Sequence, residues 1–165
     1  PSEIMQYLAH EHPNQKIVID PVSIGKARKI YHYVGEFHTI KCNRLEAEYL
    51  SDCSIESLED VPKAAQALLD KGLKQVFITL GKEGAYYASK EKQGFLPSYA
   101  KKVVNVTGAG DAFTAGIVYG MLSQLNIQEI AQFATSMSSL SLESMQTVNP
   151  SMSLEKVKHK MREEI

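Results

Sequence analysis

The sequence predicts an α/β fold in which a largely parallel sheet is covered by helices on both faces, a three-layer α/β/α sandwich. Short apolar stretches alternate with helical stretches of about 10 to 15 residues, which is the order found in parallel sheets. Residues 75–80 and 85–88 are separated only by Gly-Lys-Glu-Gly, so this pair is the expected antiparallel exception. No repeat or linker interrupts the pattern, and we expect one domain over residues 1–165.

Each expected element follows from the spacing of its apolar residues. Residues 3–12 place Ile4 and Leu8 on one side of a helix that ends before Pro13. Residues 61–71 form an amphipathic helix closed by Gly72. By the same criteria we expect further helices over 24–34, 43–50, 109–123, 127–145 and 154–164, and strands over 16–19, 37–42, 75–80, 84–88 and 101–104.

The composition is typical of a globular chain, and the net charge gives no indication of a polyanionic partner. The 165 residues are 44% apolar with a net charge of -1, which gives no reason to expect nucleic acid or an anionic membrane as partner. Cys42 and Cys53 have no metal-binding spacing and form no disulfide framework, and Cys42 is expected to be a buried free thiol that suits a reducing cytoplasm. No signal peptide is visible, and the chain opens with Pro1 rather than Met, which fits a fragment or a trimmed product.

The longest apolar run also carries a stripe of small residues. Residues 112–122 fall short of the roughly 20 residues of a membrane span. Ala112, Gly116 and Gly120 recur at every fourth position of this expected helix. This face is therefore expected to pack closely against the sheet.

The stretch over residues 104–120 is the most informative about function. Gly108 and Gly110 flank Ala109 in a turn between an apolar segment and a small-residue helix, and glycine there permits positive φ and close approach of a ligand. The unpaired N–H groups at a helix start favour anions. Asp111 would repel a phosphate unless it does chemistry, such as taking a proton from a hydroxyl that attacks that phosphate. The alternative from spacing alone is a plain tight turn followed by a first-turn acidic residue.

Four stretches together resemble the ribokinase-like (phosphofructokinase B type) sugar and nucleoside kinases. The Thr-Gly-Ala-Gly-Asp of residues 107–111 is similar to the C-terminal signature of that family, and residues 19–23, 41–48 and 78–84 agree in order and spacing. Within the family, the stretches Asp-Pro-Val-Ser, Asn-Arg-Leu-Glu-Ala-Glu and Asn-Val-Thr-Gly-Ala-Gly-Asp are most similar to those of pseudouridine kinases. The resemblance implies that residues 1–165 are the C-terminal nucleotide-binding part of a ribokinase-like kinase domain, without its N-terminal part and β lid.

The resemblance also assigns roles at the carboxyl ends of the expected strands. Asn43 and Glu46 would help to hold Mg²⁺, through water, and the nucleotide phosphates, although the same pair is also a capping box that needs no ligand. Thr79 and Gly81 would lie beside the nucleotide, with the Thr hydroxyl reaching a phosphate. The alternative is that these two residues only end the strand and begin a turn, without a ligand.

Three further positions carry implied roles. Asn105 and Thr107 stand where many relatives have Asp-Thr-Thr near a monovalent-cation site, so Asn105 is a candidate K⁺ ligand with less charge, and Thr107 a nucleotide-binding residue. Thr135 would lie near the adenine. Its alternative is a small residue that permits close helix packing.

The resemblance implies ATP-dependent phosphorylation of a sugar or nucleoside hydroxyl, with pseudouridine as the expected acceptor. Asp111 would be the base, and Gly108, Ala109 and Gly110 would form the anion hole. The 165 residues alone are expected to be poorly active because the substrate-selecting part is missing, and an unpaired sheet edge would favour a homodimer. Two alternatives stay open: a non-catalytic nucleotide-binding or interaction module, and a kinase for ribose or another sugar.

Overall fold

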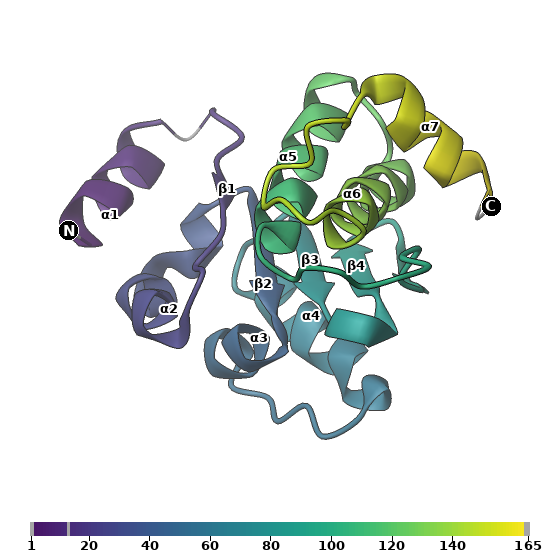
Figure 1. Ribbon diagram of the computed structural model, residues 1–165. Coiled ribbons are helices and arrows are strands. Elements are labelled where there is room, and N and C mark those ends of the chain that lie inside the picture. The colour runs from purple at the N-terminus through teal and green to yellow at the C-terminus, as the bar shows by residue number, and fades with distance from the viewer. Residues whose placement is uncertain (1, 13, 164–165) are drawn as a thin grey trace. The chain divides into compact units, whose positions relative to one another are not determined.

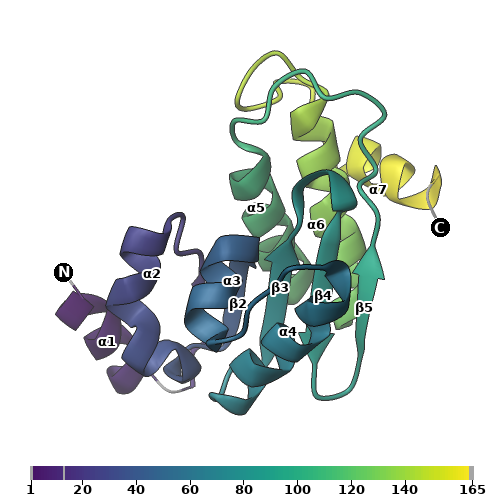
Figure 2. The same cartoon turned by 90° about the horizontal axis from the view of Figure 1, so that it is seen from below.

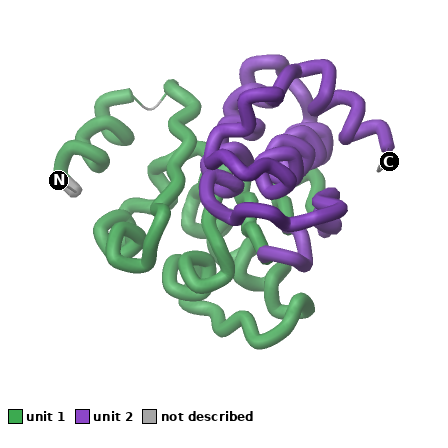
Figure 3. Tube along the Cα trace, viewed as in Figure 1, with its two compact units in different colours: residues 1–80, 86–94 green, residues 81–85, 95–165 purple. Residues whose placement is uncertain are grey.

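The computed structural model describes residues 2–12 and 14–163, and Figure 1 shows their helices and strands. The chain forms two compact units, drawn in different colours in Figure 3. Unit 1 comprises residues 1–80 and 86–94, and unit 2 comprises residues 81–85 and 95–165. No helix of the described residues is long and apolar enough to cross a membrane.

A five-stranded mixed sheet has the order β1-β2-β3-β4-β5. Strands β1 (Val18–Ile19), β2 (Thr39–Asn43) and β3 (Gln75–Thr79) are parallel, and Asn43 lies opposite Thr79 at the carboxyl ends of β2 and β3. Strand β4 (Ala85–Ser89) neighbours β3 and is joined to it only by residues 80–84, which are too few for a parallel crossover. The expected antiparallel pair is therefore present, and β5 (Gln93–Leu96) extends it by a hairpin.

Helices of unit 1 cover the parallel strands. Helix α3 (Arg44–Ser51) contacts β2 and β3, and α4 (Val61–Asp70) contacts β3 (Figure 2). Helices α1 (Ser2–Glu11) and α2 (Ile24–Ile30) contact each other, and α2 also contacts α3. The shared core holds the fully buried Phe37, Ile40, Leu50, Leu68 and Ile78. Short 3-10 turns occupy Tyr31–Glu36, Leu58–Asp60 and Gly81–Glu83.

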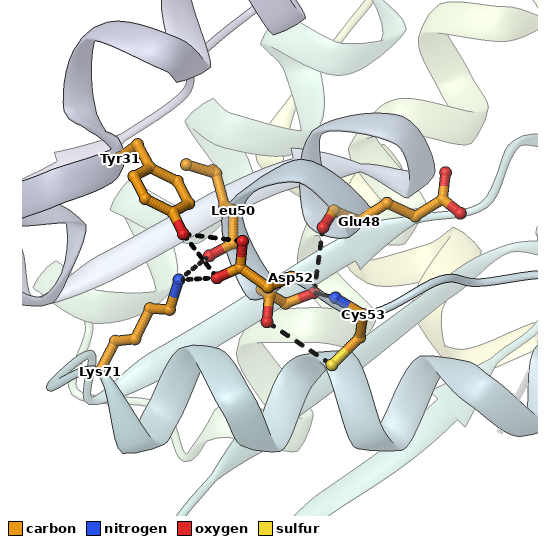
Figure 4. Close-up of polar contacts among 7 residues, drawn as sticks. Tyr31, Glu48, Leu50, Asp52, Cys53 and Lys71 are labelled. Atoms are coloured by element: carbon orange, nitrogen blue, oxygen red, sulfur yellow. Dashed lines mark hydrogen bonds and ion pairs between the residues drawn. The ribbon is translucent and has the colours of Figure 1, made fainter.

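A polar cluster fixes the end of α3 (Figure 4). The Tyr31 hydroxyl donates to both carboxylate oxygens of Asp52, at 2.7 and 2.8 Å. Lys71 Nζ lies 2.7 Å from Asp52 Oδ2 and donates to the Leu50 carbonyl at 2.6 Å. The hydrogen bond from Lys71, supported by that from Tyr31, holds the pKa of Asp52 below its usual value. These contacts connect the segment after α2 and the end of α4 to α3, the helix that carries Glu46.

Unit 2 contains the helices α5 (Ala109–Leu122), α6 (Ile127–Leu142) and α7 (Leu154–Glu163). Helix α5 packs against α6 so closely that a Cβ at Gly116 would lie 2.5 Å from the Cα of Ala134, and one at Gly120 would lie 2.8 Å from the Ile130 side chain. The expectation that this face of the helix packs on the sheet is therefore wrong. A stripe of small residues lets two backbones approach, and here the second backbone is a helix.

Two expected elements differ from the structure. Residues 101–104 form no strand, because the N–H groups of Val104 and Asn105 donate to the Leu142 carbonyl at 2.8 and 3.2 Å, at the end of α6. The fifth strand is Gln93–Leu96 instead, which was not predicted. The expected helix over 24–34 is α-helical only to Ile30 and continues as a 3-10 turn, with Tyr33 at the non-helical φ of -133°.

Candidate functional site

The carboxyl ends of the parallel strands in unit 1 gather charged and polar side chains. Asp20 directly follows β1, and its Oδ2 lies 3.0 Å from Nζ of Lys41 on β2. Lys41 is only 7% exposed, so this is a buried ion pair. Asp20 Oδ1 also accepts the N–H of Val22, a valine with a φ of 65°, and so supports a strained turn. Ligands of parallel sheets bind beyond such strand ends.

Asn43 and Glu46 form the capping box that their spacing predicts. Glu46 Oε2 accepts the Asn43 N–H at 2.9 Å, and Asn43 Oδ1 accepts the Glu46 N–H at 3.0 Å. Glu46 is 1% exposed, and its other oxygen, Oε1, is buried with no hydrogen-bond partner among the described residues. An unsatisfied buried carboxylate oxygen is costly, so one acceptor remains for a ligand. These oxygen ligands suit a hydrated Mg²⁺, which keeps several waters and is held by only one or two carboxylates.

The described residues contain no cluster of three or more His, Cys, Asp or Glu side chains that could enclose a metal.

Thr79 is the last residue of β3, and Gly81 lies two residues further along the chain. Thr79 Oγ1 donates to the Cys42 carbonyl at 3.3 Å, which ties the ends of β2 and β3 together and leaves the Thr79 oxygen as an acceptor. Gly81 has a φ of 64°, and nothing lies within 4 Å of the Cβ position there.

Cys42 is the fully buried free thiol that we expected. Burial raises its pKa strongly, so it stays a neutral thiol.

The glycine turn of unit 2 is built from Asn105 to Gly108. Asn105 Oδ1 accepts the Thr107 N–H at 2.9 Å, and Asn105 Nδ2 donates to the Met145 carbonyl at 3.3 Å. Gly108 directly precedes α5 as its N-cap residue with a φ of 85°, and a Cβ there would lie 2.4 Å from the Thr147 carbonyl oxygen. Both the backbone conformation and the close approach therefore require glycine.

Asp111 lies in the first turn of α5 and is exposed. Gly108, the N-cap residue, makes no side-chain hydrogen bond to this helix, and the Ala109 N–H donates to the Val106 carbonyl at 3.5 Å, so an anion would meet the following N–H groups of the first turn. A pocket of about 270 Å³ adjoins them, and it is lined by Gly108, Asp111, Ala112, Ala115, Met137, Ser141, Thr147, Val148, Asn149 and Met152. The turn, the carboxylate and a cavity thus lie together within unit 2.

The remaining predicted residue is buried. Thr135 on α6 is 4% exposed, it is not among the pocket residues, and its Oγ1 has no hydrogen-bond partner among the described residues. The predicted site residues therefore form two groups. Asn43, Glu46 and Thr79 lie in unit 1, and Gly81, Thr135 and residues 105–111 lie in unit 2.

Two features of these groups were not predicted from the sequence. Lys41 was detectable as a charge in an otherwise apolar strand, two residues before Asn43. The pocket walls at Thr147 and Met152 were not, because nothing in the local sequence places them against Gly108.

Comparison with known proteins agrees with the geometry. The model of the pfkB family carbohydrate kinases matches residues 2–154. Pseudouridine kinase of Escherichia coli is 34% identical over 156 residues, which cover 94% of this chain and 50% of that protein. The chain thus spans about half the length of the curated relatives it matches.

Solved structures show the same fold. A Clostridium perfringens protein assigned as a sugar kinase superposes with a TM-score of 0.93 at 38% identity, over 99% of this chain and 52% of that one. Arabidopsis thaliana ribokinase, crystallised with ribose and ATP, gives a TM-score of 0.81 at 23% identity, over 98% of this chain and 53% of that one. The fold is therefore ribokinase-like, as expected, and the chain belongs to the pfkB family of carbohydrate kinases.

Proposed function

We propose that this chain is the nucleotide-binding and phosphoryl-transfer part of an ATP-dependent kinase for a sugar or nucleoside hydroxyl. The observation that carries the proposal is the arrangement at the start of α5, where exposed Asp111 adjoins an uncapped helix N-terminus and a pocket. Membership of the carbohydrate kinase family supports it. Cytoplasmic location is part of the proposal and is supported by the free thiols Cys42 and Cys53.

In the proposed reaction Asp111 accepts the proton of the acceptor hydroxyl as its oxygen attacks the γ-phosphorus of ATP. The new O–P bond forms as the bond to the β-phosphate oxygen breaks, and ADP leaves. The N–H groups of Gly108, Ala109 and Gly110 stabilise the charge on the transferring group. Mg²⁺, held through water by Glu46 and Asn43, would neutralise phosphate charge.

Pseudouridine is the proposed acceptor, and the 34% identity to pseudouridine kinase of Escherichia coli supports it. Ribose or another sugar is the alternative within the same class of reaction. Thr79, Gly81, Thr107 and Thr135 are proposed to contact the nucleotide. Asn105 is a proposed K⁺ ligand, which predicts higher turnover when K⁺ replaces Na⁺ in the assay.

The first experiment measures ADP release by the full-length gene product with Mg-ATP and a panel that contains pseudouridine and ribose. Asp111→Asn should lower kcat by roughly 10²- to 10⁴-fold, because it removes the base, and should leave ATP affinity unchanged. The control is Asp70→Asn, at an exposed position on α4 where the amide oxygen can still accept from Gln66. Normal turnover of Asp111→Asn would refute the base, and ATP binding without turnover of any acceptor would favour the non-catalytic module.

Glu46→Gln distinguishes a role of Glu46 in holding Mg²⁺ from its role in capping α3. Glutamine can still accept the N–H of Asn43, so the capping box survives while the charge is lost. If Glu46 helps to hold Mg²⁺, the Mg²⁺ concentration for half-maximal activity should rise about 10- to 100-fold. Glu129→Gln is the matched control, since Glu129 forms the same box with Asn126 at 2.9 and 3.1 Å. Equal, small effects of both variants would leave Glu46 with a purely structural role.

A further inference from the structure

Basic residues also gather in unit 1 at the amino ends of the parallel strands, the edge of the sheet opposite the candidate Mg²⁺ site. Lys16 lies two residues before β1, and His38 and Lys74 directly precede β2 and β3. Backbone hydrogen bonds hold these segments side by side. The N–H of His38 donates to the Ile17 carbonyl at 3.2 Å, and the N–H of Lys74 donates to the His38 carbonyl at 2.9 Å. Three basic residues therefore occupy neighbouring rows of this edge.

A cavity of about 900 Å³ adjoins this edge, which is within the size range of sites for organic ligands. Its wall includes the backbones of Gly35 and Gly72, and a Cβ at Gly72 would lie 2.6 Å from the Gly35 carbonyl oxygen. The turns that carry these two glycines are thus fixed against each other. The ionisable residues of the lining are Lys16, Lys74, His10, His38 and Glu36.

The charges of the two lysines are not neutralised by the protein. Among the residues that the structure describes, neither Lys16 nor Lys74 has a side-chain hydrogen bond or an ion pair. Glu36 is the one carboxylate in the lining, so positive charge is in excess there. Burial, together with the charges of Lys16 and Lys74, lowers the pKa of His38. Both ammonium groups therefore act on the same ring, and an anion between them would relieve their repulsion.

The hydrogen bonds of His38 determine which ring nitrogen responds to an anion. The Thr39 hydroxyl donates to Gln75 Oε1 at 3.3 Å, so its oxygen accepts from His38 Nδ1 at 2.8 Å. The neutral ring then has its lone pair on Nε2, and this nitrogen gains the proton when the ring becomes charged. A nearby anion favours the charged ring, so binding of an anion and protonation of Nε2 support each other.

We propose that this cavity binds the phosphate group of an organic phosphate between Lys16, Lys74 and the protonated ring of His38. Ammonium groups bind phosphate as point charges. The side-chain amides of Asn14 and Gln15 also lie in the lining, and amides both donate to and accept from the hydroxyls of a sugar. The five residues of β2 separate this edge from Asn43 by about 13 Å, so the inference does not depend on the proposed function.

The experiment follows the His38 ring by NMR at pH 7 in the full-length gene product with ¹³C-labelled histidine, and His38→Gln assigns the signal. A saturating non-hydrolysable ATP analogue with Mg²⁺ is present throughout, so that a ligand cannot act through the nucleotide site. The probes are uridine 5′-monophosphate (UMP), inorganic phosphate and uridine. We expect UMP to move the signal saturably toward that of the protonated ring, uridine to have no effect, and inorganic phosphate to bind at least about tenfold more weakly than UMP.

Three variants locate the site. Lys16→Gln and Lys74→Gln should each weaken UMP at least about tenfold, because each removes a charged hydrogen-bond donor. Both lysines are exposed, so neither variant disturbs the core. Lys90→Gln is the matched control, since Lys90 is an exposed lysine of unit 1 that lies outside the cavity. It removes the same charge and should leave the affinity for UMP unchanged.

The outcomes separate this inference from the proposed function. Weaker binding of UMP in both cavity variants, but not in Lys90→Gln, would establish the site. Equal weakening in all three variants would overturn it, because only the overall charge would then matter. Inorganic phosphate that binds as tightly as UMP would overturn the organic ligand. A His38 signal that UMP leaves unmoved would overturn the whole inference, and ADP release by the same protein would still decide the proposed function on its own.

Discussion

Gly116 on α5 offers the sharpest test of the helix packing that shapes the pocket. A Cβ at this position would lie 2.5 Å from the Cα of Ala134, whereas ordinary contacts begin at 3.4 Å. In Gly116→Ala the two helices therefore have to separate by about 1 Å in a close-packed interior. Overpacking of this kind costs about 1–3 kcal/mol, and the better helix propensity of alanine returns up to about 1 kcal/mol. We expect a net loss of about 1–2 kcal/mol in the free energy of unfolding.

The matched control is Gly25→Ala on α2. Gly25 is also helical, but the nearest atom to its added Cβ is Ser23 Oγ at 4.0 Å. This variant should gain up to about 1 kcal/mol, because only the backbone term changes. Urea unfolding followed by far-UV circular dichroism measures the free energy of unfolding of both variants. Equal stabilisation by the two alanines would refute the close contact between the helices.

Three further predictions test the site and the charges around it. Gly108→Ala should lower ADP release more than tenfold, because glycine's φ of 85° and the Thr147 oxygen, 2.4 Å from an added Cβ, both disfavour a side chain. Burial alone would raise the pKa of Glu143, but hydrogen bonds from two lysine residues outweigh it and lower the pKa. This stabilisation is complete above the pKa of the unfolded chain and is lost as the pH falls through the folded pKa, so Glu143→Gln should reduce the acid sensitivity of thermal unfolding. Tyr31→Phe should raise the pKa of Asp52 toward its usual value in an NMR titration, since it removes a hydrogen-bond donor to the carboxylate.

Local rules predicted what local contacts decide. The capping box of Asn43 and Glu46 lies within one helical turn, and its residues suffice to specify both hydrogen bonds. The turn at Gly108 was recognisable for the same reason, because a positive φ is a property of the backbone at that residue. The parallel order of β1, β2 and β3 followed from the helices between them.

Contacts between distant residues were the source of the errors. Residues 101–104 have the apolar pattern of a strand, but the N–H groups of Val104 and Asn105 bind the Leu142 carbonyl, which no local rule could anticipate. The buried pair of Asp20 and Lys41 joins two strands in the same way. A sequence gives the donors and acceptors of a segment but not the partners that lie far along the chain.

Gly108, directly before α5, and Gly116, within it, show why the signature alone does not define the site. Gly108 is required by its own backbone and by the Thr147 carbonyl, while Gly116, two turns further, is required by the backbone of α6. The first glycine shapes the turn that we propose to bind phosphate, and the second sets the distance between the helices that carry Ala115 and Met137, the two sides of the pocket. A substitution at Gly116 should therefore change nucleotide affinity as well as stability, although it touches no ligand. In this protein the packing of α5 against α6 and the shape of the candidate site depend on the same few ångströms of helix separation.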